Sequence, residues 1–443
     1  MKISPLFVFG ILCWGTSTAN AQEKTPLKLE DAVQLAWTKS NDISLASSKV
    51  ATKKYELQAS KNNQYPDLKL SGQYQRLTNA TIDLVPNSAS GALPTGGPVD
   101  RLMLGQLTAS VPVFAGFKIQ NNIDLHDNLY QAETARAFQS KEEIALKVVN
   151  YYASLYKAQK TIEILKENQK RAKQRVVDFI DLEKNGIIPR NDLLKAQLQV
   201  SKIQLAIDEA TNNWNIVNFY LVNLLKLDSA TQIEIIEKDF ANFQMTNIPV
   251  DEQPALQNRK DLEALRLQGK ASESYIKIAR SAYFPTIAIL GGYTALDLHN
   301  VVSVQNAMNI GVGISYDFTS LLKNEALVKV AESKASEVHN TEALLTDYIK
   351  VQVQKAIEDY QLAIKQDVVY AEAIDQASEN YRIVKDKYDN GLSNTNDLLE
   401  ADVDQLTAKI NKALSKANII QKYYELLSVT GQLSQTFNPS NYK

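Results

Sequence analysis

The chain has 443 residues, with 48 basic and 50 acidic side chains and a formal charge of -2. This balance excludes the broad basic surface on which nucleic-acid binding depends. One Cys and three His exclude a disulfide scaffold and a cysteine-based zinc site, so we expect neither a metal centre nor a cofactor.

Residues 1–21 are predicted to be a secretory signal peptide. Lys2 supplies a positive start, residues 5–14 are largely apolar, and Ala19-Asn20-Ala21 fits a cleavage site. Cys13 lies in this segment, so the exported chain would contain no cysteine. No later run of 18 apolar residues predicts a transmembrane helix, and a membrane-embedded form would therefore have to use β-strands.

The first structural repeat, 22–227, contains a predicted helix followed by two strands at about 66–76 and 103–114. Apolar side chains alternate with polar ones along both strands: Leu68, Leu70, Tyr74, Met103, Leu107, Ala109, Val111 and Val113. This pattern fits either a soluble sheet packed on a core or a membrane sheet with one lipid face. Aromatic residues at the strand ends and the export signal favour the membrane sheet. The segment between them, 76–102, is expected to be a surface loop.

The strands are followed by a long helical hairpin. Glycine and proline are absent from residues 117–185, a stretch far longer than the average helix of about 11–12 residues. A helix of this length would extend about 100 Å at 1.5 Å per residue. A single chain offers no core large enough to bury it, so such helices are expected to pack side by side as coiled coils. Gly186 is expected to end the descending helix at a tip near 186–192.

The same plan recurs in a second repeat, 259–430, with strands at about 285–294 and 308–318 and a tip near 391–397. Three pairs of matching blocks indicate the duplication. At the first strand of each repeat, Pro66-x-Leu68-x-Leu70-x-Gly72-x-Tyr74 matches Pro285-x-Ile287-x-Ile289-x-Gly291-x-Tyr293, and at the end of the second strand Pro112-Val113-Phe114 matches Tyr316-Asp317-Phe318. At the tips, Gly186-x4-Asn191-Asp192-Leu193-Leu194-x-Ala196 matches Gly391-x4-Asn396-Asp397-Leu398-Leu399-x-Ala401. The connecting segment 228–258 and the tail 431–443 are expected to form a small equatorial band around the middle of the long helices.

Four strands are too few to close a transmembrane barrel, because the smallest barrels have about eight. If the strands are in the membrane, several chains must contribute to one barrel. The sequence therefore predicts an oligomer.

This order of elements resembles the TolC-type outer-membrane efflux protein family, a likeness that also includes the opening Leu29-Glu30-Asp31-Ala32. The resemblance implies a mainly α fold with a β-barrel portion. It implies a homotrimer, with a 12-stranded barrel in the cell outer membrane and an α-helical tunnel of antiparallel coiled coils across the periplasm. It also implies a passive channel of a tripartite efflux or type I secretion system, whose partners are a periplasmic adaptor (membrane fusion) protein and an inner-membrane pump of RND, ABC or MFS type.

The resemblance also assigns roles at the two tips. It implies a periplasmic gate at Asp192, Tyr388, Asp397 and Glu400. It implies adaptor contacts at Asn185, Gly186, Ile187, Asn390, Gly391 and Leu392. The family's gate arginine falls at Ser393 here, and Arg190 is a candidate substitute from the other tip.

The acidic residues at the tips allow two interpretations. Asp397 and Glu400 share one helix face, so a trimer would bring together carboxylates that attract cations. Alternatively, Asp397 and Asp192 only stabilise the first turns of their helices against the helix dipole.

Other classes of protein fit the sequence less well. No Gly-rich nucleotide-binding motif is present, and the isolated histidines suggest surface positions, so we expect no enzyme. A periplasmic adaptor would carry one helical hairpin in a strand-rich domain, whereas this chain predicts two, each preceded by a strand pair. A purely structural coiled-coil protein would leave the alternating strands unexplained.

Overall fold

The computed structural model describes residues 24–80, 99–236 and 252–437. The predicted signal peptide, most of the loop expected at 76–102 and part of the 228–258 connection lie outside these residues. The elements of the first repeat are β1 (Lys24–Leu27), α1 (Leu29–Lys39), α2 (Asn41–Asn62), β2 (Asp67–Ala80), β3 (Val99–Ala115), α3 (Lys118–Lys184) and α4 (Arg190–Leu225).

The remaining elements repeat this order. They are β4 (Gln232–Ile235), α6 (Gln253–Asn258), α7 (Lys260–Arg280), a short 3-10 helix (Ser281–Tyr283), β5 (Thr286–Leu298), β6 (Val302–Ser315), α8 (Ser320–Asp389), α9 (Thr395–Val429) and α10 (Leu433–Phe437). The prediction of a duplicated, mainly helical chain with a smaller sheet is confirmed. Among the described residues, none of the helices is both long and apolar enough to cross a membrane.

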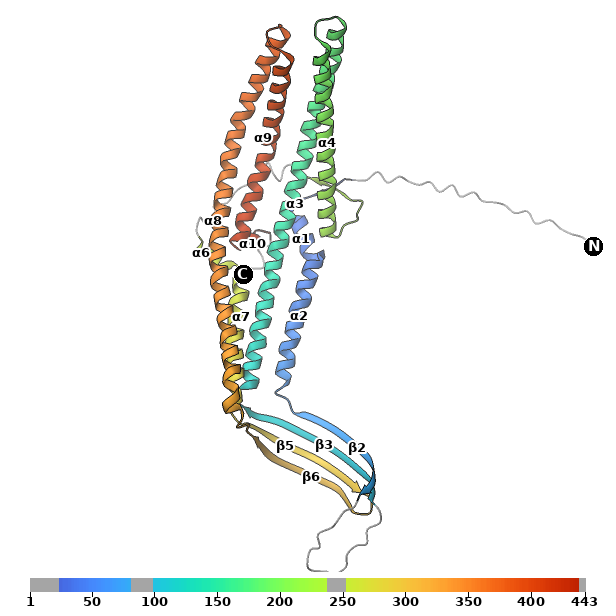
Figure 1. Cartoon of the computed structure of the whole chain (residues 1–443), viewed down its shortest axis with the longest axis vertical. Helices are drawn as coiled ribbons and strands as arrows, with labels where there is room; N and C mark the ends of the chain where they lie inside the picture. The colour runs from blue at the N-terminus through green and yellow to red at the C-terminus, as the bar shows by residue number, and fades with distance from the viewer. Residues whose placement is uncertain (1–23, 81–98, 237–251, 438–443) are drawn as a thin grey trace, which may run out of the picture.

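Figure 1 shows an elongated molecule in which the helical hairpins α3–α4 and α8–α9 lie side by side, with their tips at one end. The sheet occupies the opposite end. Between the sheet and the middle of the molecule, α2 packs on α3 and α7 packs on both α3 and α8. The distance between sheet and tips follows from two uninterrupted helices, α3 of 67 residues and α8 of 70 residues.

The four strands form one antiparallel sheet in the order β2-β3-β5-β6, so β3 and β5 join the two repeats and β2 and β6 are the edges. The register places apolar side chains in one row across the sheet: Leu70, Leu107, Tyr293 and Met308. The neighbouring row on the opposite face is Ser71, Gln106, Thr294 and Ala307. Because side chains alternate along each strand, the whole sheet has one apolar and one more polar face.

The strand boundaries differ from the predicted ones. All four strands run farther toward the loop end of the sheet than expected, most of all β6, which begins at Val302 instead of about residue 308. At its other end β6 stops at Ser315, short of the predicted residue 318. The carboxylate of Asp317 accepts a hydrogen bond from the backbone N–H of Thr319 (2.9 Å), which turns the chain into α8.

The main hydrophobic core lies at the middle of the molecule, where α1, α3, α4, α9 and α10 meet. The parallel pair β1 and β4 adds Ile233 and Ile235 to this core. Tyr152 donates a hydrogen bond to the backbone carbonyl of Leu27 (2.8 Å), and Trp37 donates one to that of Lys141 (3.0 Å). The equatorial region therefore includes the N-terminal strand, which the sequence did not predict.

Candidate functional site

The two hairpin tips have the same backbone geometry. Gly186 and Gly391 adopt φ angles of +69° and +72°, a left-handed conformation that glycine adopts without strain. After each glycine the next N–H bonds back into the helix, from Ile187 to the Leu182 carbonyl (2.9 Å) and from Leu392 to that of Lys387 (2.7 Å). Both helices thus end in a Schellman motif, as expected of their glycines.

The tips also present the same surface. The side-chain amides of Asn185 and Asn390 each donate to a backbone carbonyl of the preceding turn, at 2.7 and 2.8 Å. Ile187 and Leu392 point into solvent, with 67% and 77% of their surface exposed. The six residues that the resemblance assigns to adaptor contact are therefore exposed at the tips.

Tyr388 and Asp192, two of the proposed gate residues, do not bond to each other directly. Thr395 lies between them: its hydroxyl donates to the Asp192 carboxylate at 2.8 Å and lies 3.3 Å from the Tyr388 hydroxyl. Since the threonine proton is used on Asp192, the tyrosine hydroxyl is the donor in the second bond. Lys195 pairs with the same carboxylate at 3.4 Å. Thr395 therefore connects the first turns of α4 and α9.

Asp397 and Glu400, the other two proposed gate residues, remain exposed in the single chain. The Ser393 hydroxyl donates to the Asp397 carboxylate (3.0 Å). Ser393, which stands where the family has its gate arginine, therefore contacts a residue of the same tip. Asn394 caps α9 by accepting from the Asp397 N–H (3.1 Å). In the single chain Arg190, the candidate substitute for the family arginine, forms its ion pair with Glu183 of its own hairpin (3.5 Å).

An apolar cluster packs next to these polar contacts. Phe179, Leu193, Ala196 and Leu398 are buried together where α3, α4 and α9 meet. The ring of Tyr388 stacks on Phe179, with 5.8 Å between the ring centroids. The hydroxyl of Tyr388 is thus positioned by packing of its ring.

A buried ion pair joins the hairpins farther from the tips. Arg175 of α3 donates to Asp402 of α9 at 3.1 Å and to the hydroxyl of Tyr381 on α8 at 3.1 Å. The side chains of Arg175 and Asp402 are only 10% and 1% exposed. Burial alone would lower the pKa of Arg175, but the ion pair with Asp402 raises it, so the guanidinium stays charged. Asn168, also buried, donates to the other Asp402 oxygen at 3.4 Å.

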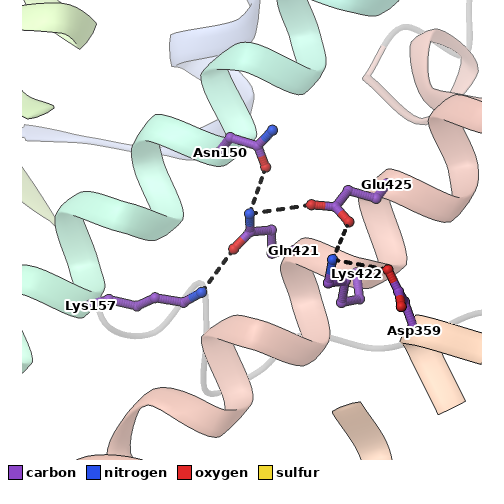
Figure 2. A network of polar contacts seen from close by, with 6 residues as sticks. All are labelled: Asn150, Lys157, Asp359, Gln421, Lys422 and Glu425. Carbon is purple, nitrogen blue, oxygen red and sulfur yellow. Dashed lines mark hydrogen bonds and ion pairs between the residues drawn. The ribbon is translucent and has the colours of Figure 1, made fainter. Parts of the chain in front are cut away.

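Figure 2 shows a second polar connection between α3 and α9, closer to the middle of the molecule. Lys157 donates to Gln421 at 2.8 Å, and the amide of Gln421 donates to Asn150 at 2.9 Å. Lys422, next along α9, pairs with Asp359 of α8 at 3.4 Å. Burial lowers the pKa of Lys157, in accord with its position between helices.

The sequence singles out neither Arg175 nor Asp402, and it marks Thr395 only as a candidate N-cap of the second ascending helix, a position that Asn394 occupies in the structure. The one available signal for Thr395 was its place directly before the Asn396-Asp397 pair of the repeat. Arg175 and Asp402 stand among many other charged residues on long helices, and such residues are most often solvated. Within the three described ranges, no group of three or more His, Cys, Asp or Glu side chains is placed to hold a metal ion.

The fold and the paired tips define an elongated protein with a sheet at one end and two helical hairpins at the other. The sequence pattern of the outer membrane efflux protein family matches residues 32–225 and 253–432. The chain therefore belongs to this family, which is one of efflux proteins and not of enzymes. None of the curated protein sequences compared with the chain matches it.

Several solved structures share the fold. The outer membrane protein VceC from Vibrio cholerae has a TM-score of 0.78 and 16% identity, over 91% of this chain and 96% of that one. The CmeC outer membrane channel of Campylobacter jejuni has a TM-score of 0.77 and 17% identity, over 91% and 86%. A membrane protein from Pseudomonas aeruginosa has a TM-score of 0.80 and 14% identity, over 91% and 92%.

Proposed function

We propose that three copies of this chain form an outer-membrane channel that conducts substrates out of the cell. The observation that carries the proposal is the four-stranded sheet: within the described residues its edge strands β2 and β6 have no further strand partner, and its apolar face packs on none of the hydrophobic clusters. On β6 the apolar side chains Met308, Ile310, Val312 and Ile314 are 69% to 86% exposed. Apolar surface of this extent in a folded protein marks a place where lipid or another protein binds.

Pairing β6 of one chain with β2 of the next satisfies both open edges at once. Three copies then give twelve strands, enough to close a transmembrane barrel. The apolar face of every strand would contact lipid, and the face with Ser71, Gln106 and Thr294 would line water. A barrel with this alternation leaves no unpaired backbone group in the bilayer.

The helical part would form a tunnel by the same threefold assembly. In the single chain α4 exposes Leu198, Leu205 and Phe219, each at 55% to 59%, and α8 exposes Val351 and Val368 at 66% and 57%. These side chains would be covered by helices of neighbouring copies. The tunnel would extend the barrel through the periplasm to the hairpin tips.

The tips would form the periplasmic entrance. Asp192, Tyr388, Asp397 and Glu400 are the proposed gate residues, supported by the contact of Asp192 and Tyr388 with Thr395. In the trimer Asp397 and Glu400 would contribute six exposed carboxylates to the entrance, which favours passage of cations. The exposed turns at Asn185–Ile187 and Asn390–Leu392 would bind a periplasmic adaptor protein, and the adaptor would join the channel to an inner-membrane pump of RND, ABC or MFS type.

The channel would be passive, because the pump supplies the energy and no reaction takes place in the conduit. Cell fractionation tests the proposal directly. The protein should be found in the outer membrane as an oligomer that dissociates into monomers on heating in detergent. Recovery as a soluble periplasmic monomer would contradict both the membrane location and the trimer.

A further inference from the structure

The apolar face of the sheet ends in two arginines, at the end of the strands far from the helices (Figure 1). The register pairs Arg76 of β2 directly with Arg101 of β3, so their side chains leave the same face. This is the face of Leu70 and Leu107, because every second residue along a strand shares a face. Like charges directly opposite each other destabilise an antiparallel strand pair. An anion between the two arginines would remove this repulsion.

The described part of the chain supplies one carboxylate for this pair of cations. Asp297 of β5 pairs with Arg101 at 3.5 Å, and Asp100, the other described acid at this end of the sheet, pairs with His299 at 2.7 Å. Within the described residues Arg76 is therefore left without an ionic partner, and its side chain is exposed. Two guanidinium groups against one carboxylate leave a net positive charge on this part of the face.

The opposite end of the same face indicates where the arginines lie in the membrane. Phe114 contacts Phe117 and Phe284 there, with ring centroids 5.4 and 6.4 Å apart, and aromatic rings are enriched at membrane interfaces. Arg101 lies thirteen positions before Phe114 along β3, which is about 44 Å at 3.4 Å per residue. At the tilt of barrel strands this spans roughly 31–36 Å across the membrane, more than the apolar band of about 25 Å. In the proposed barrel Arg76 and Arg101 thus lie at the level of the outer headgroups.

A trough at Gly72 and Gly105 lies on the same face, toward the bilayer centre. The row next to the two arginines is Tyr74 with Met103, and the following row is Gly72 with Gly105. A Cβ atom added at Gly72 would meet no atom within 4 Å, and one at Gly105 would meet only the carbonyl oxygen of Ala295 at 4.0 Å. Tyr74 is 64% exposed, as expected of a tyrosine at a membrane interface. The trough has room for an apolar chain whose polar end reaches the arginines.

We propose that Arg76 and Arg101 bind the phosphate group of an outer-leaflet glycolipid, with one of its acyl chains in the trough at Gly72 and Gly105. Arginine suits this role because its planar guanidinium donates two parallel hydrogen bonds to phosphate oxygens. The phosphate would also offset the repulsion between the two like charges. The inference rests on the proposed trimeric channel, which places this end of the sheet at the cell surface and would carry one such site on each chain.

Native mass spectrometry of the purified oligomer tests the arginines, with lipid A as the probe because it carries both phosphate groups and acyl chains. Arg76→Gln should weaken lipid A binding about tenfold or more, since it removes charge-assisted hydrogen bonds. This variant breaks no ion pair of the described residues, so the oligomer should still form. Lys69→Gln is the matched control, because it removes the same charge from the same strand on the opposite face. It should bind lipid A as the unaltered protein does.

Three further measurements distinguish a lipid from a free phosphate ion. Lipid A from which the phosphates have been removed should bind the unaltered oligomer about tenfold or more weakly, for the same reason. Inorganic phosphate at millimolar concentration should not displace lipid A, because it makes no contact in the trough. Gly72→Leu should weaken lipid A binding by filling the trough. Equal binding of the two forms of lipid A, displacement by phosphate, or unchanged binding in Arg76→Gln or Gly72→Leu would overturn the inference.

The oligomer itself separates this inference from the proposed function. If the unaltered protein gives no heat-dissociable oligomer in the outer membrane, the proposed function is wrong and the inference fails with it. If the oligomer forms and Arg76→Gln binds lipid A as well as the unaltered protein, only the inference fails.

Discussion

Thr395 donates a hydrogen bond of 2.8 Å to the carboxylate of Asp192, which connects the first turn of α9 to the first turn of α4. This bond is largely shielded from water, because Thr395 is 3% exposed. It is also charge-assisted, and such bonds contribute about 1.5–3 kcal/mol. The contact between the two tips thus depends on a residue outside the acidic positions that the resemblance assigned.

Thr395→Val should weaken the contact between the tips and raise the resting conductance of the proposed trimer. Valine has the shape of threonine but cannot donate, so among the described residues the Asp192 carboxylate retains Lys195 as its side-chain partner. Single-channel recording in KCl measures the effect. Thr407→Val on the same helix is the matched control, because the Thr407 hydroxyl only donates to the Val403 carbonyl of the preceding turn. Equal resting conductance of both variants would contradict the assignment.

Arg175→Ala should destabilise the folded chain by about 3–5 kcal/mol, because it leaves the buried Asp402 carboxylate without its cation. Arg171→Ala is the control on the same helix. Arg171 pairs with Glu167 on the surface, with 34% and 71% of the side chains exposed, and such pairs contribute about 0–1 kcal/mol. Denaturant unfolding of the purified protein measures both.

Replacing both members of the buried pair provides a further test. Arg175→Met with Asp402→Leu should lose much less stability than Arg175→Ala, since neither charge is then left in the core. A double variant as unstable as Arg175→Ala would show that the loss comes from packing and not from the unpaired carboxylate.

Glu142 should make stability depend on pH. This residue of α3 is 4% exposed and accepts from the backbone N–H of Ser434 at 2.9 Å, which fixes the start of α10. Burial raises the pKa of Glu142, only partly offset by hydrogen bonds from Ser434 and Leu433. As the pH rises from the ordinary carboxyl pKa through the raised one, the unfolded chain loses the proton first, so stability falls across this window.

Glu142→Gln should abolish this component of the pH dependence, which denaturant midpoints at a series of pH values would reveal. Glu143→Gln is the control, because Glu143 is the next residue of the helix and its side chain is exposed. It should leave the pH dependence as in the unaltered chain. An unchanged slope in Glu142→Gln would show that another group is responsible.

Gly391→Trp should abolish export while trimers still form. A Cβ atom added at this position meets no atom within 4 Å, so a larger side chain has room to project from the tip into the proposed adaptor surface. Gly391→Ala separates this effect from backbone strain, because alanine is small but carries the strain of a Cβ at the positive φ angle. Export of a pump substrate in whole cells is the measurement, and normal export by the tryptophan variant would contradict the proposed contact.

Ile310→Arg should impair membrane assembly, whereas Asn309→Arg should not. Ile310 belongs to the apolar face of β6 and is 86% exposed, while Asn309 is the adjacent residue on the opposite face. An arginine on a lipid face costs about 2–4 kcal/mol near the bilayer midplane. The yield of the heat-dissociable oligomer in outer-membrane fractions compares the two, and equal yields would count against the proposed lipid face.

The strands of the sheet and the long helices could be predicted, because each is determined by a pattern within one stretch of the sequence. Period-two alternation identified β2 and β3, the absence of glycine and proline identified α3, and the internal repeat extended both predictions to β5, β6 and α8. Strand β1 could not be predicted from the sequence, because it is four residues long, contains Pro26 and pairs with β4, more than 200 residues away. Its formation depends on a tertiary contact that no local pattern carries.

The contacts between the hairpins also join residues that lie far apart in the sequence. Arg175 resembles its neighbour Arg171 in sequence, but the orientation of α3 against α9 buries the side chain of Arg175 and leaves that of Arg171 partly exposed. Thr395 is important because it meets Asp192, 203 residues earlier in the chain. The repeat predicted where the tips lie and matched Asp192 with Asp397, but Thr395, which bonds to Asp192, stands where the first repeat has Arg190.

The open edges of the sheet also bear on how the protein matures. A strand edge with free N–H and C=O groups pairs readily with any extended segment, and a newly exported monomer carries two such edges beside an apolar face. Its lifetime as a free species must be short compared with the time for misassembly in the crowded periplasm. If the chain assembles as the proposed trimer, production faster than three chains can meet should yield aggregate in place of channel, and the yield should respond to expression rate more strongly than to the stability of the helices.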